Sequence, residues 1–159
     1  MMAFAALLDR LIYTPARNGK LALMARYFRD APDPDRGWAL ASLTGALSIP
    51  SAKPAMVRGL IAARTDPTLF ALSYDYVGDL AETCALLWPD NAGEGPAPRL
   101  SEIVETLRQT SKAETPRRMA AWLDRLDANG RYGFLKLLTG GLRVGVSARL
   151  AKTALAETF

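Results

Sequence analysis

The stretch Leu138-Thr139-Gly140-Gly141-Leu142-Arg143-Val144-Gly145-Val146-Ser147 is a glycine-rich turn that leads into a helical pattern over residues 148–157. Glycine lets the backbone adopt positive φ angles and approach a partner closely. Ser147 is a good cap for the helix that follows. We therefore expect free backbone N–H groups, a helix N-terminus and Arg143 to converge at one place, an arrangement that holds a phosphate without reading a base. The alternative is an ordinary helix connection whose glycines serve packing alone.

This stretch has a counterpart 95 residues upstream, and the two align without a gap. The shift places Arg36, Leu40, Leu43, Thr44, Gly45 and Leu47 on Arg131, Leu135, Leu138, Thr139, Gly140 and Leu142. The repeat copies are residues 14–61 and 109–156, and residues 63–108 connect them. Two copies predict a pseudo-two-fold pair rather than a solenoid. Such a pair suits a ligand with two equivalent features, such as the two strands of a DNA groove.

The first copy departs from the second at two positions of the turn. Ser48 stands where the second copy has Arg143, and Pro50 where it has Gly145. Lys53 is the best cation near the first turn. We therefore expect the first turn to be the weaker anion site.

Length and composition favour one folded domain spanning residues 1–159. Half of the residues are hydrophobic, which is typical of a globular chain, and the chain has no histidine. The missing histidines remove His-based acid–base chemistry and most zinc sites. The single cysteine, Cys84, rules out an internal disulfide and lies in an apolar run, so we expect it to be buried. No apolar run is long enough to span a bilayer, and we expect a cytoplasmic protein.

Apolar periodicity predicts helices along the whole chain. The fold class is all-α: a compact bundle of about ten short helices with an internal pseudo-two-fold repeat. Thr14 is expected to cap the second helix, with Arg17-Asn18-Gly19-Lys20 as a polar basic turn before a helix body over residues 21–30. Ser101 is expected to cap a helix over residues 102–109.

The charges follow the repeat. Residues 1–62 hold eight Lys/Arg against four Asp/Glu, residues 63–109 three against eight, and residues 110–159 nine against four. Both copies are therefore basic and the segment between them is acidic. A basic surface that coincides with the repeats is typical of a protein that binds a polyanion, although a solvated surface of mixed charge is the alternative.

The acidic segment offers Asp75, Asp79 and Glu82 as candidate metal or acid–base groups, but their spacing fits a solvated helix face better. We predict no metal site and no catalytic residue in this chain, because nothing in it forms a nucleophile–base pair.

Residues 139–147, with Leu150 and Ala154-Leu155-Ala156 after them, resemble the end of the N-terminal DNA-binding domain of bacterial multi-domain ATP-dependent DNA ligases. The opening is similar as well: Thr14, Arg17 and Lys20 precede a leucine-rich helix with Tyr27-Phe28. The resemblance covers nearly the whole chain. It implies an all-helical domain that grips the minor groove of nicked duplex through paired turns during DNA repair and replication.

Catalysis in that family needs a lysine in a Lys-x-Asp-Gly setting, which becomes adenylated. None of the five lysines here has that context: Lys20, Lys53, Lys112, Lys136 and Lys152. The resemblance therefore implies a DNA-binding module without its nucleotidyltransferase and OB domains. By itself it would bind DNA without using ATP or joining ends. The parent ligase would use ATP and Mg²⁺, and its catalytic domain would be a partner.

We predict sequence-independent contacts to backbone phosphates. The turn of the second copy would bind one strand, and the Arg17–Lys20 turn, with the first-copy turn and residues 110–112, the other. The candidate DNA-binding residues are Arg17, Asn18, Lys20, Gly45, Ser48, Lys53, Thr110, Ser111, Lys112, Gly140, Gly141, Arg143, Gly145, Val146, Ser147 and Arg149. We expect a monomer in a bacterial cytoplasm with no membrane partner.

A function of another class is a helical protein–protein interaction module. Trp38, Trp88 or Trp122 would then be the anchor of an interface. Their helical spacing favours core positions instead. A salt titration separates the two functions, because phosphate binding weakens steeply with salt and an apolar interface hardly changes.

Overall fold

The computed structural model describes residues 1–90, 93, 95–139, 142 and 144–159. The described part is all-helical and compact, which confirms the predicted fold class. Its ten helices are α1 (Met2–Ile12), α2 (Arg17–Asp30), α3 (Asp35–Leu43), α4 (Pro54–Ala62), α5 (Pro67–Val77), α6 (Leu80–Leu87), α7 (Leu100–Gln109), α8 (Thr115–Asp124), α9 (Ala128–Thr139) and α10 (Ala148–Thr158).

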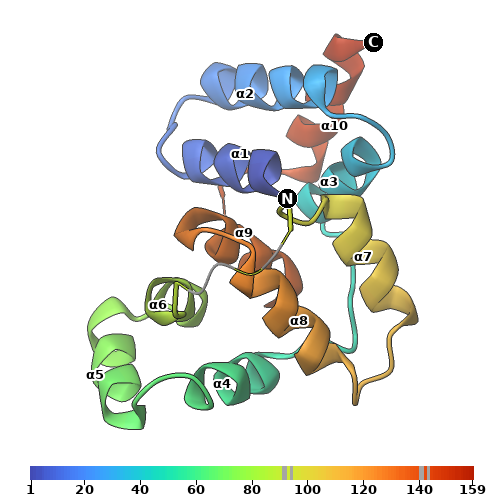
Figure 1. The fold of residues 1–159 in the computed structure, drawn as a ribbon. Coiled ribbons are helices and arrows are strands. Elements are labelled where there is room, and N and C mark those ends of the chain that lie inside the picture. The colour runs from blue at the N-terminus through green and yellow to red at the C-terminus, as the bar shows by residue number, and fades with distance from the viewer. Residues whose placement is uncertain (91–92, 94, 140–141, 143) are drawn as a thin grey trace.

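The centre of the fold is the contact of α9 with α1 on one side and α6 on the other. Phe4 and Leu8 of α1 and Phe134 of α9 are fully buried in this core. Gly133 makes the close approach possible, since a Cβ at this position would lie 2.7 Å from Cβ of Ala5. Figure 1 shows α2 and α10 above this centre and α4 and α5 below it.

The helices of the two predicted copies occupy matching places in the sequence. Adding 95 to the bounds of α3 and α4 gives 130–138 and 149–157, within α9 and α10. The packing is reciprocal: α10 packs on α2, and α4 packs on α8. The hydroxyls of Thr44 and Thr139 donate to the carbonyls of Leu40 and Leu135, at 2.9 and 2.7 Å. These observations favour the pseudo-two-fold relation, which stays a prediction.

Three local predictions were wrong. Arg17 to Lys20 is not a turn but the first turn of α2, and Ala16, not Thr14, is the N-cap residue. The hydroxyl of Thr14 instead donates to the Arg10 carbonyl at the end of α1, at 2.7 Å. Ser101 lies inside α7, which begins one residue earlier, and its amide donates to the Asp35 carboxylate at 3.0 Å. Thr14 and Ser101 each bond to a residue outside the helix that they were expected to cap.

Gly45 ends α3 in a Schellman motif. Its φ is +77°, its N–H donates to the Ser42 carbonyl, and the N–H of Ala46 donates to the Ala41 carbonyl. A residue with a side chain would be strained in this left-handed conformation. Helix termination therefore accounts for this glycine without any ligand.

Candidate nucleic-acid interface

The structure brings two of the predicted segments together. The Nζ atom of Lys20, in the first turn of α2, donates to the carbonyl oxygen of Gly145 at 3.0 Å. Gly145 lies two residues before the N-cap residue of α10, and the two positions are 125 residues apart in the chain. Near the far end of α10, the hydroxyl of Thr158 donates to the Ala25 carbonyl of α2 at 3.2 Å. The Lys20–Gly145 contact therefore brings the first turn of α2 next to the connection that leads into α10.

Both helix starts are rich in cations and lack carboxylates. Arg17 and Lys20 lie in the first turn of α2, Arg149 in the first turn of α10, and neither first turn contains an acidic residue. The arginines are exposed and the lysine is half-buried. Amide dipoles give a helix N-terminus a partial positive charge, so cations there are unfavourable unless an anion compensates them. The arrangement is poor for the stability of the free protein and good for binding an anion.

The start of α10 is built as predicted. The hydroxyl of Ser147 accepts the N–H of Leu150 at 3.0 Å, which confirms Ser147 as the N-cap residue. Gly145 has a φ of +69°, and a Cβ at this position would collide with the Lys20 ammonium. The positive φ favours glycine here, whereas the end of the flexible Lys20 side chain could move aside.

The start of α2 has a different construction. Ala16 is extended and offers no side chain to cap the helix. Asn18 is exposed in the first turn, beside Arg17. We define the α2/α10 cluster as Arg17, Asn18, Lys20, Gly145, Val146, Ser147 and Arg149. The predicted residues Gly140, Gly141 and Arg143 lie outside the described residues.

The other predicted residues lie on the connections that lead into α4 and α8. Lys53 is the exposed N-cap residue of α4, and Lys112 is exposed on the loop before α8. Figure 1 shows that loop at the lower right of the molecule, far from the connection between α1 and α2 at the upper left. The prediction had placed Arg17–Lys20 on the same strand as Lys53, whereas the structure joins this segment to Gly145.

Several polar groups near α4 and α8 already have local partners. The hydroxyl of Thr110 donates to the Thr106 carbonyl at 2.6 Å, and the hydroxyl of Ser111 accepts the Glu114 N–H at 3.3 Å. The exposed Ser48 lies on the connection between α3 and α4. We define the α4/α8 cluster as Ser48, Lys53, Thr110, Ser111 and Lys112, with Arg117 and Arg118 added.

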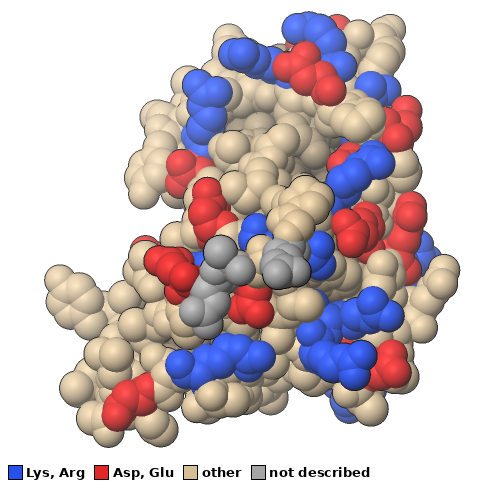
Figure 2. All heavy atoms as spheres, in the orientation of Figure 1, with Lys and Arg blue, Asp and Glu red and all other residues tan. Residues whose placement is uncertain are grey.

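Sequence reasoning missed Arg117 and Arg118. Both are exposed in the first turn of α8, close in sequence to Lys112. Figure 2 shows Lys and Arg side chains gathered at the lower right, where α8 and its preceding loop lie in Figure 1. The helix start at Thr115-Pro116 was predicted, but the two arginines that directly follow it were not named as candidates.

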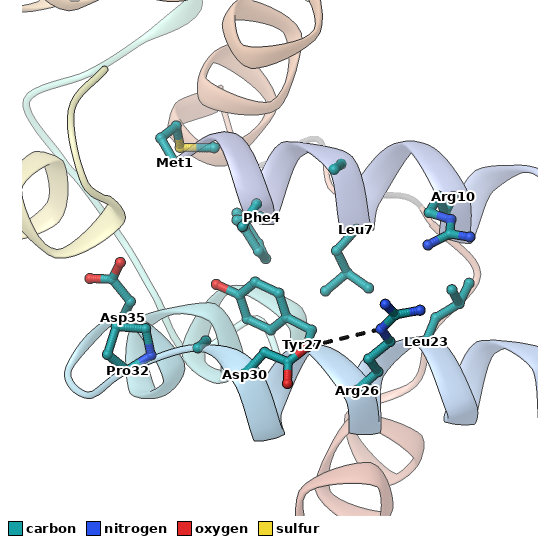
Figure 3. Close-up of a pocket in the computed structure, with 13 residues that line it drawn as sticks. Met1, Phe4, Leu7, Arg10, Leu23, Arg26, Tyr27, Asp30, Pro32 and Asp35 are labelled. Atoms are coloured by element: carbon teal, nitrogen blue, oxygen red, sulfur yellow. Dashed lines mark ion pairs between the residues drawn. The ribbon is translucent and has the colours of Figure 1, made fainter. Parts of the chain in front are cut away.

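A cavity of about 340 Å³ between α1 and α2 offers a different kind of site. Figure 3 shows Phe4 and Leu7 of α1 facing Tyr27 of α2, with ring centroids of the two aromatic residues 6.0 Å apart. An ion pair between Arg26 and Asp30, at 3.9 Å, lies at its edge. The lining is largely apolar and its charges are balanced, so the cavity has no marked preference for an anion.

The titratable groups of this cavity do not form a catalytic pair. Burial raises the pKa of Tyr27, and the negative charge of Asp35 adds to the shift. Asp35 in turn accepts the amide of Ser101 and lies 3.6 Å from the guanidinium of Arg99. Within the described residues, no group of His, Cys, Asp and Glu side chains could hold a metal ion.

Asp79 has a structural role. One carboxylate oxygen accepts the Glu82 N–H at the start of α6, at 2.8 Å, and the other pairs with Lys136 of α9. Partial burial raises the pKa of Asp79, but the hydrogen bonds from Lys136 and Glu82 outweigh burial, so the pKa lies below its ordinary value. Asp79, one of the three candidate metal residues, therefore links α6 to α9 through its pair with Lys136.

Two of the three tryptophans are unavailable as interface anchors. Trp88 and Trp122 are 3% exposed, and the indole N–H of Trp88 donates to Asp124 at 2.9 Å. Trp38 is half-buried and donates to Glu105 at 3.3 Å. These residues are used within the domain.

No protein-family model and no curated protein sequence matches this chain. In the described part, every helix is too short or too polar to cross a membrane. The candidate interface therefore depends on the geometry of the two clusters and on the charges of the chain.

Proposed function

We propose that this domain binds duplex DNA through backbone phosphates, without reading sequence. The observation that carries the proposal is the meeting of two helix starts, α2 and α10, which hold three cations and no carboxylate in their first turns. Phosphate oxygens would accept hydrogen bonds from the amides of these first turns and from Arg17 and Arg149. Lys20 would add charge while it fixes the two helices to one another.

The α4/α8 cluster would bind a second stretch of backbone. It combines a helix start with exposed cations, as the α2/α10 cluster does, and α4 packs on α8 as α10 packs on α2. A duplex offers two backbones related by a two-fold axis, so two related clusters can each take one strand. Because phosphate contacts carry no base information, we expect all sequences to bind alike.

The resemblance to the DNA-binding domain of bacterial ATP-dependent DNA ligases extends the proposal. In that setting the domain would hold nicked duplex in the minor groove while the catalytic domain of the parent ligase closes around the break. Gly140, Gly141 and Arg143, which carry much of the resemblance, would belong to the same interface. ATP and Mg²⁺ would act in the catalytic domain, since no lysine of this chain stands in the required motif. Such a domain would work in repair and replication in the cytoplasm.

Binding to nicked, intact and single-stranded DNA of the same sequence tests the proposal. Fluorescence anisotropy should show tighter binding to both duplexes than to the single strand. Arg17→Gln together with Arg149→Gln should weaken duplex binding at least tenfold. Arg26→Gln is the matched control, because Arg26 lies on α2 beyond the first turn and is paired with Asp30. Equal weakening by the control would refute the assigned interface.

A further inference from the structure

Helix α5 has an apolar sequence and no buried residue. Leu69, Leu72 and Tyr76 are 50%, 65% and 92% exposed. Their spacing of three and four residues places them on one side of the helix. Tyr74 lies on the opposite side of α5 from Leu72 and stacks on Phe70 toward the rest of the protein, with ring centroids 6.0 Å apart. The outward stripe therefore has no partner within the described part of the domain.

The stripe continues onto α6. Leu86 is 61% exposed and forms a ridge between two hollows. One hollow, of about 310 Å³, is lined by Leu72, Tyr76 and other uncharged residues. The other, of about 370 Å³, is lined by Ile12 at the end of α1, by Tyr13 after it, and by residues of α6 and α9. We define the α5–α6 surface as Leu69, Leu72, Tyr76 and Leu86.

The charged residues that line the two hollows are acidic, and Lys136, which lies over the ring of Tyr132 at the second hollow, is paired with Asp79. Residues 65–98 contain no Lys or Arg, although the whole chain carries a net charge of +4. Asp75 and Glu82 are exposed on α5 and α6, and Glu82 lines the second hollow together with Asp9. Arg58 of α4 contacts α5 through the ring of Tyr74, on its inner side. Figure 2 shows the part of the molecule where α5 lies as tan and red.

We propose that the α5–α6 surface is the docking site of a partner protein that presents a basic amphipathic helix. Apolar side chains at helical spacing accept the apolar stripe of another helix, which packs into the hollows beside Leu86. Carboxylates along the edge favour a partner with Lys or Arg beside its apolar stripe. The same carboxylates repel DNA and anionic membranes, so this surface is separate from the two phosphate-binding clusters.

A synthetic helix tests the proposal on the intact chain. The probe is a fluorescein-labelled peptide of roughly 18 residues, long enough to form a helix on binding, with Leu at positions i, i+3, i+4 and i+7 and Lys elsewhere. A matched peptide has Glu in place of every Lys. We expect the Lys peptide to bind, and the Glu peptide to bind at least tenfold more weakly.

Variants locate the site. Leu72→Ser with Tyr76→Ser should weaken binding of the Lys peptide at least tenfold. The variant should still fold, because both side chains are exposed. Phe159→Ser, which removes a 76% exposed ring at the far end of α10, should leave binding unchanged. Glu82→Gln should weaken binding two- to threefold and reduce its dependence on salt.

Three results would overturn the proposal: equal binding of the two peptides, no binding of the Lys peptide, or binding that survives Leu72→Ser with Tyr76→Ser. Self-association of the chain in analytical ultracentrifugation, abolished by the same double substitution, would assign the surface to a second copy instead. Arg17→Gln with Arg149→Gln should not change peptide binding, so the outcome does not depend on whether the domain binds DNA.

Discussion

Replacing Arg17 by glutamate should make the protein more stable and a weaker DNA binder. Arg17 is the first residue of α2, where Ala16 offers no side-chain cap and the first turn has no carboxylate. A charge in the first turn interacts with the helix dipole by about 0.3–1 kcal/mol. Removing a repulsive cation and adding an attractive anion should together stabilise the fold by about 0.6–2 kcal/mol. For a domain of this size, that raises Tm by roughly 1–8 °C.

Thermal unfolding by circular dichroism at low ionic strength measures the gain, and it should shrink at 1 M salt because screening weakens the dipole interaction. Arg29→Glu is the matched control. Arg29 lies in the last turn of the same helix, where the dipole favours a cation, so this substitution should lower the stability of the protein. Nicked-duplex binding should fall at least tenfold for Arg17→Glu. A lower Tm for Arg17→Glu, or an unchanged affinity for DNA, would refute the reasoning.

Four further substitutions and one labelling experiment test other parts of the structure. Gly45→Ala and Gly145→Ala should each lower the free energy of urea unfolding by about 1–2 kcal/mol, because both glycines have a positive φ. Gly145→Ala should also weaken DNA binding, because its Cβ moves the end of the Lys20 side chain away from the Gly145 carbonyl. Ser147→Ala should lower the free energy of unfolding by about 1 kcal/mol through the lost cap of α10. The depressed pKa of Asp79 makes its stabilising contribution complete above its unfolded pKa of about 3.9 and lost as pH falls below the folded value, so Asp79→Asn should reduce the acid sensitivity of unfolding. Burial raises the pKa of Cys84 to about 12, so iodoacetamide at pH 8 should label it only after the chain unfolds.

The helical architecture could be predicted from sequence because it depends on local patterns. Apolar periodicity identified the bundle, and the serine at position 147 was recognised as a cap from its place before an amphipathic segment. Helix starts were harder where another segment competes for the capping residue. Thr14 bonds back to the Arg10 carbonyl at the end of α1, a local alternative to capping, whereas the partner of Ser101, Asp35, lies 66 residues away and cannot be recognised from neighbouring residues.

The site was predicted in parts but not as grouped in the structure. Lys20 and Gly145 were both named as candidates, yet their contact depends on how α2 packs against α10, which no local rule fixes. Gly45 was read as a phosphate-binding glycine, whereas its amide is already donated within the end of α3. The exposed stripe of α5 could not be recognised either, because an apolar helix looks the same in sequence whether its stripe faces the core or a partner.

The salt dependence of nicked-duplex binding tests the central claim most directly. With roughly five to eight phosphates neutralised, the slope of log K against log salt should be about −5 to −7 for the unchanged protein. Arg17→Gln with Arg149→Gln should make the slope less steep by about 1.8, since each lost phosphate contact removes about 0.9. A slope near zero, or one that the double substitution leaves unchanged, would contradict a phosphate-binding site at the starts of α2 and α10.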